Sequence, residues 1–592
     1  MSDEALLLSR GDLSLESGNI AKVLQFFGVP ARNATVTEFL GRTGLDHESS
    51  SKSRVLCSSN TFLELIQALE DNSALSLSWR EHVHSVFVYA GDIPAALQQL
   101  VRRLTGDKSA VVDQARFGGQ FVVSDRLDDF CGVMAGLPIS ASKANFGASL
   151  VLNTENGNAT DIISLGDGAV FLKLEYNGVP VFLSTSKEII DIAAELTSQN
   201  FDVREHFLSA VPLVLYIRWA FAETCWRTPE ASACLVIDDP LLKPTHGFVD
   251  FQELLSLMKR HKFSTNIAFI PWNWRRSAPE VVQLFRENPE HYSLSVHGCD
   301  HTRAEFGSSN QQRLYCKAQQ GLERMDHHES ITGIHHDPIM VFPQGIFSEA
   351  AMTALKRTNL IASVNNDVIS VDPRPRTITL CDVWDIAVMR YSFPLFTRRY
   401  PWEGIENFAF DALLGKPAIA IIHHDYCSDR CARLIDFIQR LNALRRAPTW
   451  RNLGEVVRRS CRQREVSPAN VEVEMYGTEL RIENRSDQPK CFVIRRRECE
   501  PSAIQQICMG SQEIAWKPVN GRIESEIELN PGENQVIKIK FHDLKATELN
   551  GDDLPYRLKA MLRRYSCELR DNYITTAKLR LANFSRRPVM SL

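Results

Sequence analysis

The sequence predicts a multidomain α/β protein with a parallel sheet in its central part, residues 206–464. Strand-like apolar runs alternate there with amphipathic helical segments, which is typical of β-α-β units. The chain has 592 residues, too many for one hydrophobic core, so several domains are expected. The alternation by itself leaves open whether the sheet is open or closed into a barrel.

The central elements follow from hydrophobic spacing. Strands are expected at 234–237, 265–270, 293–296, 339–342, 360–364 and 419–422, and helices at 249–259, 279–287, 311–325, 348–357 and 431–444. In either form of a parallel sheet, the active site gathers at the carboxyl ends of the strands.

The flanking parts have different patterns. Residues 1–205 are expected to form an α/β domain of unknown role, with a strand-helix unit at 84–104, a hairpin at 169–184 turning at Asn177-Gly178, and a helix at 187–196. Residues 465–545 alternate apolar and polar residues in short runs, which predicts a β-sandwich.

Residues 546–592 are expected to form a basic helical tail, with nine Lys/Arg against two acidic residues from Arg557 onward. This pattern fits a solvated or domain-covering helix, and also a contact with an acidic partner or a membrane surface.

Composition excludes several classes of function. A net charge of -5 gives no reason to expect a nucleic-acid partner. The 14 cysteines form no CxxC pairs, so a structural zinc framework is not expected. No apolar run approaches the roughly 20 residues of a membrane span, and the first residues do not resemble a secretory signal. We therefore expect a cytoplasmic protein, with membrane association through the tail kept open.

Three short motifs each follow an apolar strand-like run. They are Val236-Ile237-Asp238-Asp239, Val296-His297-Gly298-Cys299-Asp300-His301, and Ile421-Ile422-His423-His424-Asp425. Because all three stand at predicted strand ends, we expect their side chains to meet at one edge of the sheet. Two His and one Asp are the ligands that a catalytic divalent ion such as Zn²⁺ takes while keeping one position open.

The motifs predict separate roles for their residues. Asp239, His297 and His301 would hold one divalent metal, with Zn²⁺ preferred, and Asp238 would accept a proton from the attacking water. Breaking an amide also requires a proton on the leaving nitrogen, for which His424 is the first choice and His423 the second.

Each motif alone also has an ordinary explanation. An Asp-Asp pair before Pro240 can simply end a strand in a turn, and a single His-x-x-x-His pair is common on protein surfaces. The doublets His327-His328 and His335-His336 have no clear relation to a strand end and are interpreted as loop residues. The coincidence of the three motifs at strand ends favours an active site.

At these residues the chain resembles the polysaccharide deacetylase family, the NodB-homology or carbohydrate esterase family 4 domain, over about 250 of its 592 residues. The family's Asp-Asp motif matches Asp238 and Asp239, and its His-Ser/Thr-x-x-His motif matches His297 to His301, with Gly298 in place of the hydroxyl residue. The apolar run that ends in a histidine matches 421–425. The resemblance implies an irregular (β/α)₇ barrel and a Zn²⁺-dependent deacetylase of N-acetylated sugars.

The family's Arg-x-Pro-x-Gly motif is met only at Pro343 and Gly345, because the arginine that orients the base is absent. We expect Arg275 or Arg276 to provide that cation. Substrate contacts are expected from Pro343 and Gly345 and from Trp272 and Trp274, whose rings can stack on a sugar or else belong to the core.

The sequence thus predicts a metal-dependent hydrolase that removes an N-acyl group from an amino sugar or polysaccharide. The alternative is a catalytically inactive carbohydrate-binding or scaffold protein in polysaccharide synthesis, favoured by the missing arginine.

Overall fold

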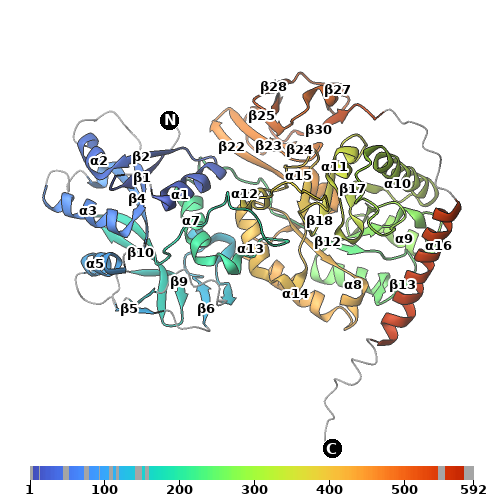
Figure 1. Ribbon diagram of the computed structural model, residues 1–592, viewed down its shortest axis with the longest axis horizontal. Helices are drawn as coiled ribbons and strands as arrows, with labels where there is room; N and C mark the ends of the chain where they lie inside the picture. Colours follow the sequence, from blue (N-terminus) through green and yellow to red (C-terminus); the bar gives the residue numbers. More distant parts are fainter. Residues whose placement is uncertain are drawn as a thin grey trace, which may run out of the picture.

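The computed structural model describes residues 4–11, 14–43, 52–72, 79–91, 94–105, 111–114, 119–140, 150–153, 159–544 and 554–578. Figure 1 shows an N-terminal sheet at one end of the long axis, a central barrel, a pair of C-terminal sheets above the barrel, and a helix along its far side. The predicted multidomain α/β class is confirmed. Among the helices in these ranges, none is long and apolar enough to cross a membrane.

The N-terminal sheet is mixed, with its parallel and antiparallel strands in one continuous layer. Its main strand order is β2-β1-β3-β4-β11-β10-β9-β6-β7, and the first five of these are parallel. The strands are β1 (Ala5–Ser9), β2 (Ala31–Thr35), β3 (Ser53–Ser58), β4 (Val83–Tyr89), β5 (Val111–Gln114), β6 (Gln120–Val123), β7 (Pro138–Ser140), β8 (Leu150–Asn153), β9 (Thr160–Leu165), β10 (Gly168–Tyr176) and β11 (Val179–Ser184).

Helices cover both faces of this sheet. They are α1 (Leu15–Phe26), α2 (Val36–Thr43), α3 (Ser59–Glu70), α5 (Pro94–Thr105), α6 (Asp128–Cys131) and α7 (Phe207–Ala220). The last of these packs on α1, α6, β4 and β11.

The predicted hairpin is confirmed, because β10 and β11 pair around Asn177 and Gly178, whose φ values of 46° and 76° suit a primed turn. The helix predicted at 187–196 is wrong. Backbone groups there bond to other segments instead, for example the Leu196 N–H to the carbonyl of Ile378 at 2.8 Å, and no helix forms.

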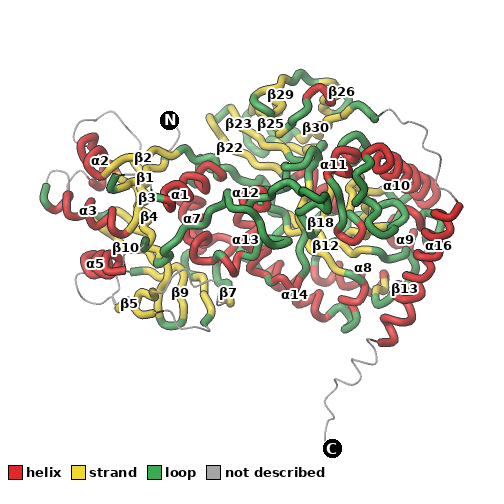
Figure 2. The backbone as a smooth tube through the Cα atoms, in the orientation of Figure 1, coloured by secondary structure: helices red, strands yellow, loops and turns green. Residues whose placement is uncertain are grey.

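The central part is a nearly closed parallel barrel of seven strands, surrounded by helices in Figure 2. The strand order is β19-β18-β17-β16-β15-β12-β20, and a bridge between Arg399 and Ala420 joins the two ends. The strands are β12 (Ser232–Asp238), β15 (Thr265–Phe269), β16 (Tyr292–His297), β17 (His336–Val341), β18 (Ala362–Asn365), β19 (Leu395–Thr397) and β20 (Ala418–Ile422). The alternative of an open sheet is thereby excluded.

The outer helices include all those predicted and several more. They are α8 (Phe251–His261), α9 (Pro279–Glu287), α10 (Gln311–Thr332), α11 (Glu349–Leu355), α12 (Leu380–Trp384), α13 (Ile405–Leu414), α14 (Ala432–Asn442) and α15 (Leu453–Arg459). Leu453 and Val456 of α15 join the apolar cluster inside the barrel with Val236 and Val341. Apolar side chains therefore fill the barrel interior, and polar residues such as Asp238 and His297 stand at the carboxyl ends of the strands.

The C-terminal sheets pack face to face around a core that includes Val473, Leu480, Phe492 and Ile537. One sheet contains β22 (Cys461–Ser467), β23 (Asn470–Met475), β25 (Lys490–Arg497), β28 (Lys517–Val519) and β29 (Arg522–Leu529); the other contains β24 (Glu479–Glu483), β26 (Ile504–Met509), β27 (Gln512–Glu513) and β30 (Asn534–Phe541). All pairs are antiparallel except β23 with β25. The predicted sandwich is confirmed.

The chain then returns to the barrel as helix α16 (Leu554–Leu569), extended by a π-helical turn at Arg570–Thr575. Figure 1 shows this helix beside α9 and β13 (Thr245–His246). Its contacts with the barrel mouth make it part of the site described below.

Candidate functional site

Asp238 and His297 point into the barrel because of strand alternation. Cys234 and Val236 of β12 belong to the interior cluster, whereas Leu235 and Ile237 face the surrounding helices. Side chains two residues apart share a face, so Asp238 follows Val236 inward. The same alternation in β16 turns His297 inward. Both residues stand at the carboxyl end of their strands.

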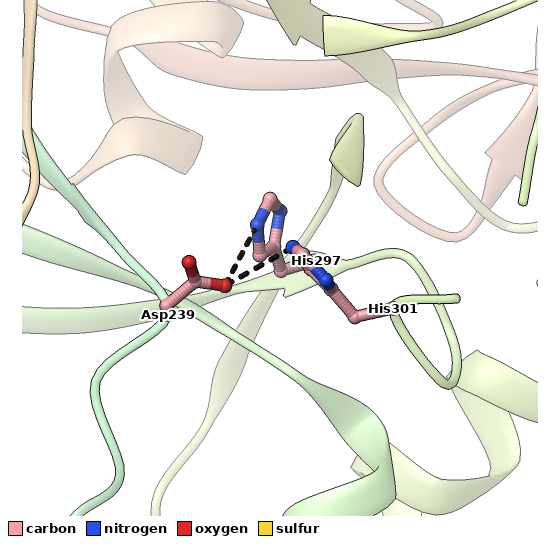
Figure 3. Close-up of side chains that lie close together, drawn as sticks. All are labelled: Asp239, His297 and His301. Atoms are coloured by element: carbon pink, nitrogen blue, oxygen red, sulfur yellow. Dashed lines mark ion pairs between the residues drawn. The ribbon is translucent and has the colours of Figure 1, made fainter. Parts of the chain in front are cut away.

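Asp239, His297 and His301 come together as predicted. Asp239 Oδ1 lies 3.4 Å from His297 Nε2 and 3.1 Å from His301 Nε2, and Figure 3 shows the carboxylate directed at both rings. Each residue offers a ligand atom within 4.8 Å of the others. Asp239 and His301 have φ values of 79° and 55°, a left-handed conformation that costs free energy in residues other than glycine and is concentrated at functional sites.

This spacing fits a tetrahedral zinc ion. Ligands about 2.0–2.1 Å from zinc are about 3.3 Å from one another in a tetrahedron, and the two measured separations are 3.1 and 3.4 Å. Burial raises the pKa of the Asp239 carboxyl, but His301 and His297 outweigh it and hold that pKa well below its usual value. The three residues can therefore hold a divalent ion with a carboxylate and two imidazoles.

Hydrogen bonds fix the ring of His297 and the backbone of the loop that carries His301. His297 Nδ1 lies 2.9 Å from the carbonyl oxygen of Val341, which fixes the ring and leaves Nε2 for an ion. The loop that carries His301 is held by Glu305, whose carboxylate accepts the backbone N–H groups of Cys299, Asp300 and His301 at 3.0, 2.8 and 3.1 Å.

Gly298 allows this loop to form. Its φ is +65°, and a Cβ there would lie 2.4 Å from Pro343 and 2.5 Å from Glu305. The Glu305 carboxylate therefore lies where a side chain at position 298 would begin. The sequence did not assign Glu305 a role, although it is an acidic residue four positions after His301.

Cys299, Asp300 and Glu305 form a second close group. Asp300 is already neutralised by Lys317 and Arg324, each 2.6 Å away, and Glu305 by the backbone donors. We interpret this group as support for the loop.

The cation beside Asp238 is Arg398, which directly follows β19. Its Nη1 and Nη2 each donate to one carboxylate oxygen at 2.7 Å, and both side chains are buried. Burial raises the pKa of the Asp238 carboxyl, but the charge of Arg398 is the main opposing effect and the pKa falls below its usual value. The expectation of Arg275 or Arg276 is wrong: Arg275 lies over the ring of Trp274 and Arg276 pairs with Glu568.

The two histidines after β20 have different surroundings. Ile422 pairs with Ile237, so His423 and Asp238 follow side by side at the strand ends, and His423 lines the same cavity as Asp239 and His301. His424 is instead enclosed by Phe248, Gly247 and the C-terminal segment, with Nε2 3.6 Å from Asp571. Gly247 is required there, because its φ is +58° and a Cβ would lie 2.2 Å from His424 Nδ1.

The cavity above the ion site measures about 240 Å³, and α16 with its extension forms one wall. From the barrel it is lined by residues including His246, Asn273, Arg276 and Gln344, and from the C-terminal segment by Arg563, Arg564, Cys567, Glu568, Arg570 and Asp571. Within the basic tail predicted from the sequence, residues 563–571 therefore line the barrel mouth.

Polar contacts fix this wall in place. Glu568 binds Lys243 at 2.6 Å and Arg276 at 2.5 Å, the Gly247 N–H donates to Asn572 at 2.7 Å, and the Tyr556 hydroxyl donates to Asp300 at 3.0 Å. Arg563 donates to the carbonyl oxygen of His301 at 3.0 Å.

The expected substrate contacts lie near this cavity but do not line it. Trp272 meets the ring of Tyr565 edge-on at 5.9 Å between centroids, and Trp274 lies under Arg275. Pro343 packs against Gly298, and Gly345 has a φ of +71°. In this loop it is Gln344, between them, that reaches the cavity.

No family model and no curated protein matches the chain. Solved structures similar to part of it include the family 4 carbohydrate esterase from Streptomyces lividans in complex with acetate, with 12% identity over 36% of this chain and 86% of that one and a TM-score of 0.22. Another is the Xyl-CE4 domain of a multidomain xylanase from the hindgut metagenome of Trinervitermes trinervoides, with 11% identity, 38% and 89% coverage and a TM-score of 0.24. A third is the Bc1960 peptidoglycan N-acetylglucosamine deacetylase, with 13% identity, 36% and 80% coverage and a TM-score of 0.21. Matches this weak say nothing about the activity of the chain.

Proposed function

We propose that the protein is a metal-dependent hydrolase that removes an N-acyl group from an amino sugar. The observation that carries this proposal is the convergence of Asp239, His297 and His301 at the barrel mouth, beside a buried Asp238 held by Arg398. A divalent ion held by the three ligands would polarise the acyl carbonyl and make a water molecule more acidic. Zn²⁺ suits this ligand set.

The chain's own residues supply the proton transfers. Asp238 accepts the proton of the attacking water, and the two hydrogen bonds from Arg398 fix the direction of its carboxylate. His423 donates a proton to the leaving nitrogen, because it lines the cavity while His424 lies behind it. His424 and Asp571 then hold the wall of the cavity together.

The alternative of an inactive scaffold was favoured by the absence of the motif arginine that would orient the base. Arg398 pairs with Asp238 instead, although it follows β19 and lies outside the 341–345 motif. A hydrolase is therefore the better supported function.

Two measurements test the proposal. Metal analysis of the purified full-length protein should give about one zinc ion per chain, and His297→Ala should lose it. Acetate release from N-acetylglucosamine and its oligomers and phosphates should require the ion, and should fall at least about 100-fold in Asp238→Asn. His423→Gln should reduce release more than His424→Gln. Full activity in Asp238→Asn would remove this residue from its proposed role.

A further inference from the structure

We propose that the cavity binds an N-acylated amino sugar that carries a negatively charged group, phosphate or carboxylate, and that Arg564 of α16 binds this group. The sugar class rests on the proposed function, whereas the negative charge follows from the wall that α16 contributes.

Positive groups outnumber negative ones on the lining. Four guanidinium groups, of Arg276, Arg563, Arg564 and Arg570, face three carboxylates, of Asp239, Glu568 and Asp571. Arg276 pairs with Glu568 at 2.5 Å and Arg570 with Asp571 at 2.7 Å. Within the described parts of the chain, no carboxylate lies within 4.0 Å of the guanidinium nitrogens of the other two arginines.

Of Arg563 and Arg564, the second gives the stronger evidence for an anionic ligand. Its side chain is 6% exposed, and its Nε is buried without a hydrogen-bond partner. Its Nη2 lies 3.2 Å from His301 Nδ1 and 3.4 Å from the carbonyl oxygen of the same residue. A buried cation without an anion is unfavourable. The nearby Asp239 partly balances it, but a divalent ion on Asp239 would take up that carboxylate's charge.

His246 provides a second polar group without a partner. It is 3% exposed, it lines the cavity, and neither ring nitrogen has a hydrogen-bond partner. A neutral imidazole has one donor and one acceptor, which suits a sugar hydroxyl. A buried polar group without a partner calls for an explanation such as water, an ion or a catalytic role, and a sugar bound in this cavity would meet both His246 and Arg564. The small volume, about 240 Å³, favours one sugar residue over a polymer.

Binding can be tested without turnover. Zinc-loaded full-length Asp238→Asn is titrated calorimetrically with N-acetylglucosamine, its 6-phosphate and 1-phosphate, and N-acetylmuramic acid, with inorganic phosphate as a further ligand. At least one anionic sugar should bind 10-fold or more tighter than N-acetylglucosamine. Adding Arg564→Met should abolish this preference, whereas adding Arg557→Met, an exposed arginine of the same helix, should leave it unchanged.

The outcomes separate this inference from the proposed function. Equal binding of neutral and anionic sugars, or a preference that survives Arg564→Met, overturns the inference even if acetate is released. Binding that depends on Arg564, without acetate release by the parent protein, refutes the hydrolase alone. If Arg564→Met does not fold, Arg564→Lys replaces it, because lysine keeps the positive charge. This variant should retain most of the preference for the anionic sugar. If it bound the anionic sugar no tighter than N-acetylglucosamine, the inference would be contradicted.

A different observation concerns the outward side of the same helix. Eight large apolar residues of α16 and its extension are between 37% and 70% exposed: Leu554, Leu558, Met561, Leu562, Tyr565, Leu569, Tyr573 and Ile574. We name this set the outer face. Their spacing of three and four residues places most of them on one stripe of the helix. Exposed apolar stripes of this kind mark interaction surfaces.

We infer that the outer face binds an anionic lipid surface. The exposed charged residues of the segment are all basic, namely Arg557, Lys559, Arg570 and Lys578, while Glu568 and Asp571 form ion pairs against the barrel. An apolar stripe flanked by cations is typical of helices that lie in a membrane interface. The same charges would repel a second copy of this segment.

Flotation with vesicles tests the inference. The full-length protein should float with phosphatidylglycerol-containing vesicles, less so in high salt, and little with phosphatidylcholine alone. Leu558→Glu with Leu562→Glu should abolish flotation. Ile331→Glu, at an apolar residue of α10 that is 63% exposed, should not. No flotation of the parent protein, or dimerisation that the double substitution disrupts, would overturn it.

Discussion

Replacing Arg398 with methionine should destabilise the barrel by about 3–5 kcal/mol, the usual cost of leaving one partner of a buried ion pair alone. Two hydrogen bonds of 2.7 Å would be lost, and the Asp238 carboxylate, whose side chain is 5% exposed, has no other hydrogen-bond donor in the described structure. Arg398 also donates to Asn366 at 2.8 Å, which adds a smaller loss. Asp238→Asn should cost a similar amount, because it leaves the guanidinium unpaired.

A double-mutant cycle measures this pair directly. Urea unfolding of the parent, both single variants and Arg398→Met/Asp238→Asn is followed after metal removal, so that ion binding does not contribute. The double variant should be less destabilised than the sum of the singles by about 3 kcal/mol. Single effects that add within about 0.5 kcal/mol would show that the two residues are independent and would refute the interpretation of Arg398 as the partner of Asp238.

Three further predictions concern the loop and the core. Gly298→Ala should lower the free energy of unfolding by about 1–3 kcal/mol, because the new Cβ would meet Pro343 and Glu305. Gly18→Ala, whose Cβ would enter open space, should not lower it. Thermal unfolding of both variants measures the difference. Glu305→Gln should weaken zinc binding by about 10- to 100-fold in a chelator competition, since the carboxylate holds the His301 loop; unchanged affinity would contradict that role. Burial lowers the pKa of Lys416 to about 8, so the unfolded chain binds more protons between about pH 8 and 10.5 and stability rises with pH there. Lys416→Met should flatten this rise, by about 3 kcal/mol at most, in urea unfolding across that range; an identical slope in both proteins would refute it.

The sequence predicted the functional residues that stand at the ends of strands with a clear hydrophobic pattern. Asp238, Asp239, His297 and His301 each end or follow a strand with clear periodicity, so their convergence could be predicted. The Arg398 contact could not, because β19 has only three residues and no alternation to reveal it. Two consecutive arginines after an apolar run, Arg398 and Arg399, were the available signal.

In helix α16, the side that faces the barrel could not be predicted from hydrophobic spacing. Its apolar residues would ordinarily be assigned to the buried side, yet they face outward. The side on the barrel carries Ala560 and Arg564, with Asp571 in the extension after the helix; one of these residues is small and two are charged. Hydrophobic spacing therefore predicts the helix but assigns the wrong side to the core.

The position of α16 in the chain also determines when the site can be completed during translation. Domains generally fold as they leave the ribosome, N-terminal ones first. The ion ligands, Arg398 and His423 all emerge before residues 554–575, which close the cavity through Arg564 and Asp571. A nascent chain can thus assemble its ligand set while the barrel mouth still lacks its last wall, and the finished pocket exists only after that late segment is released.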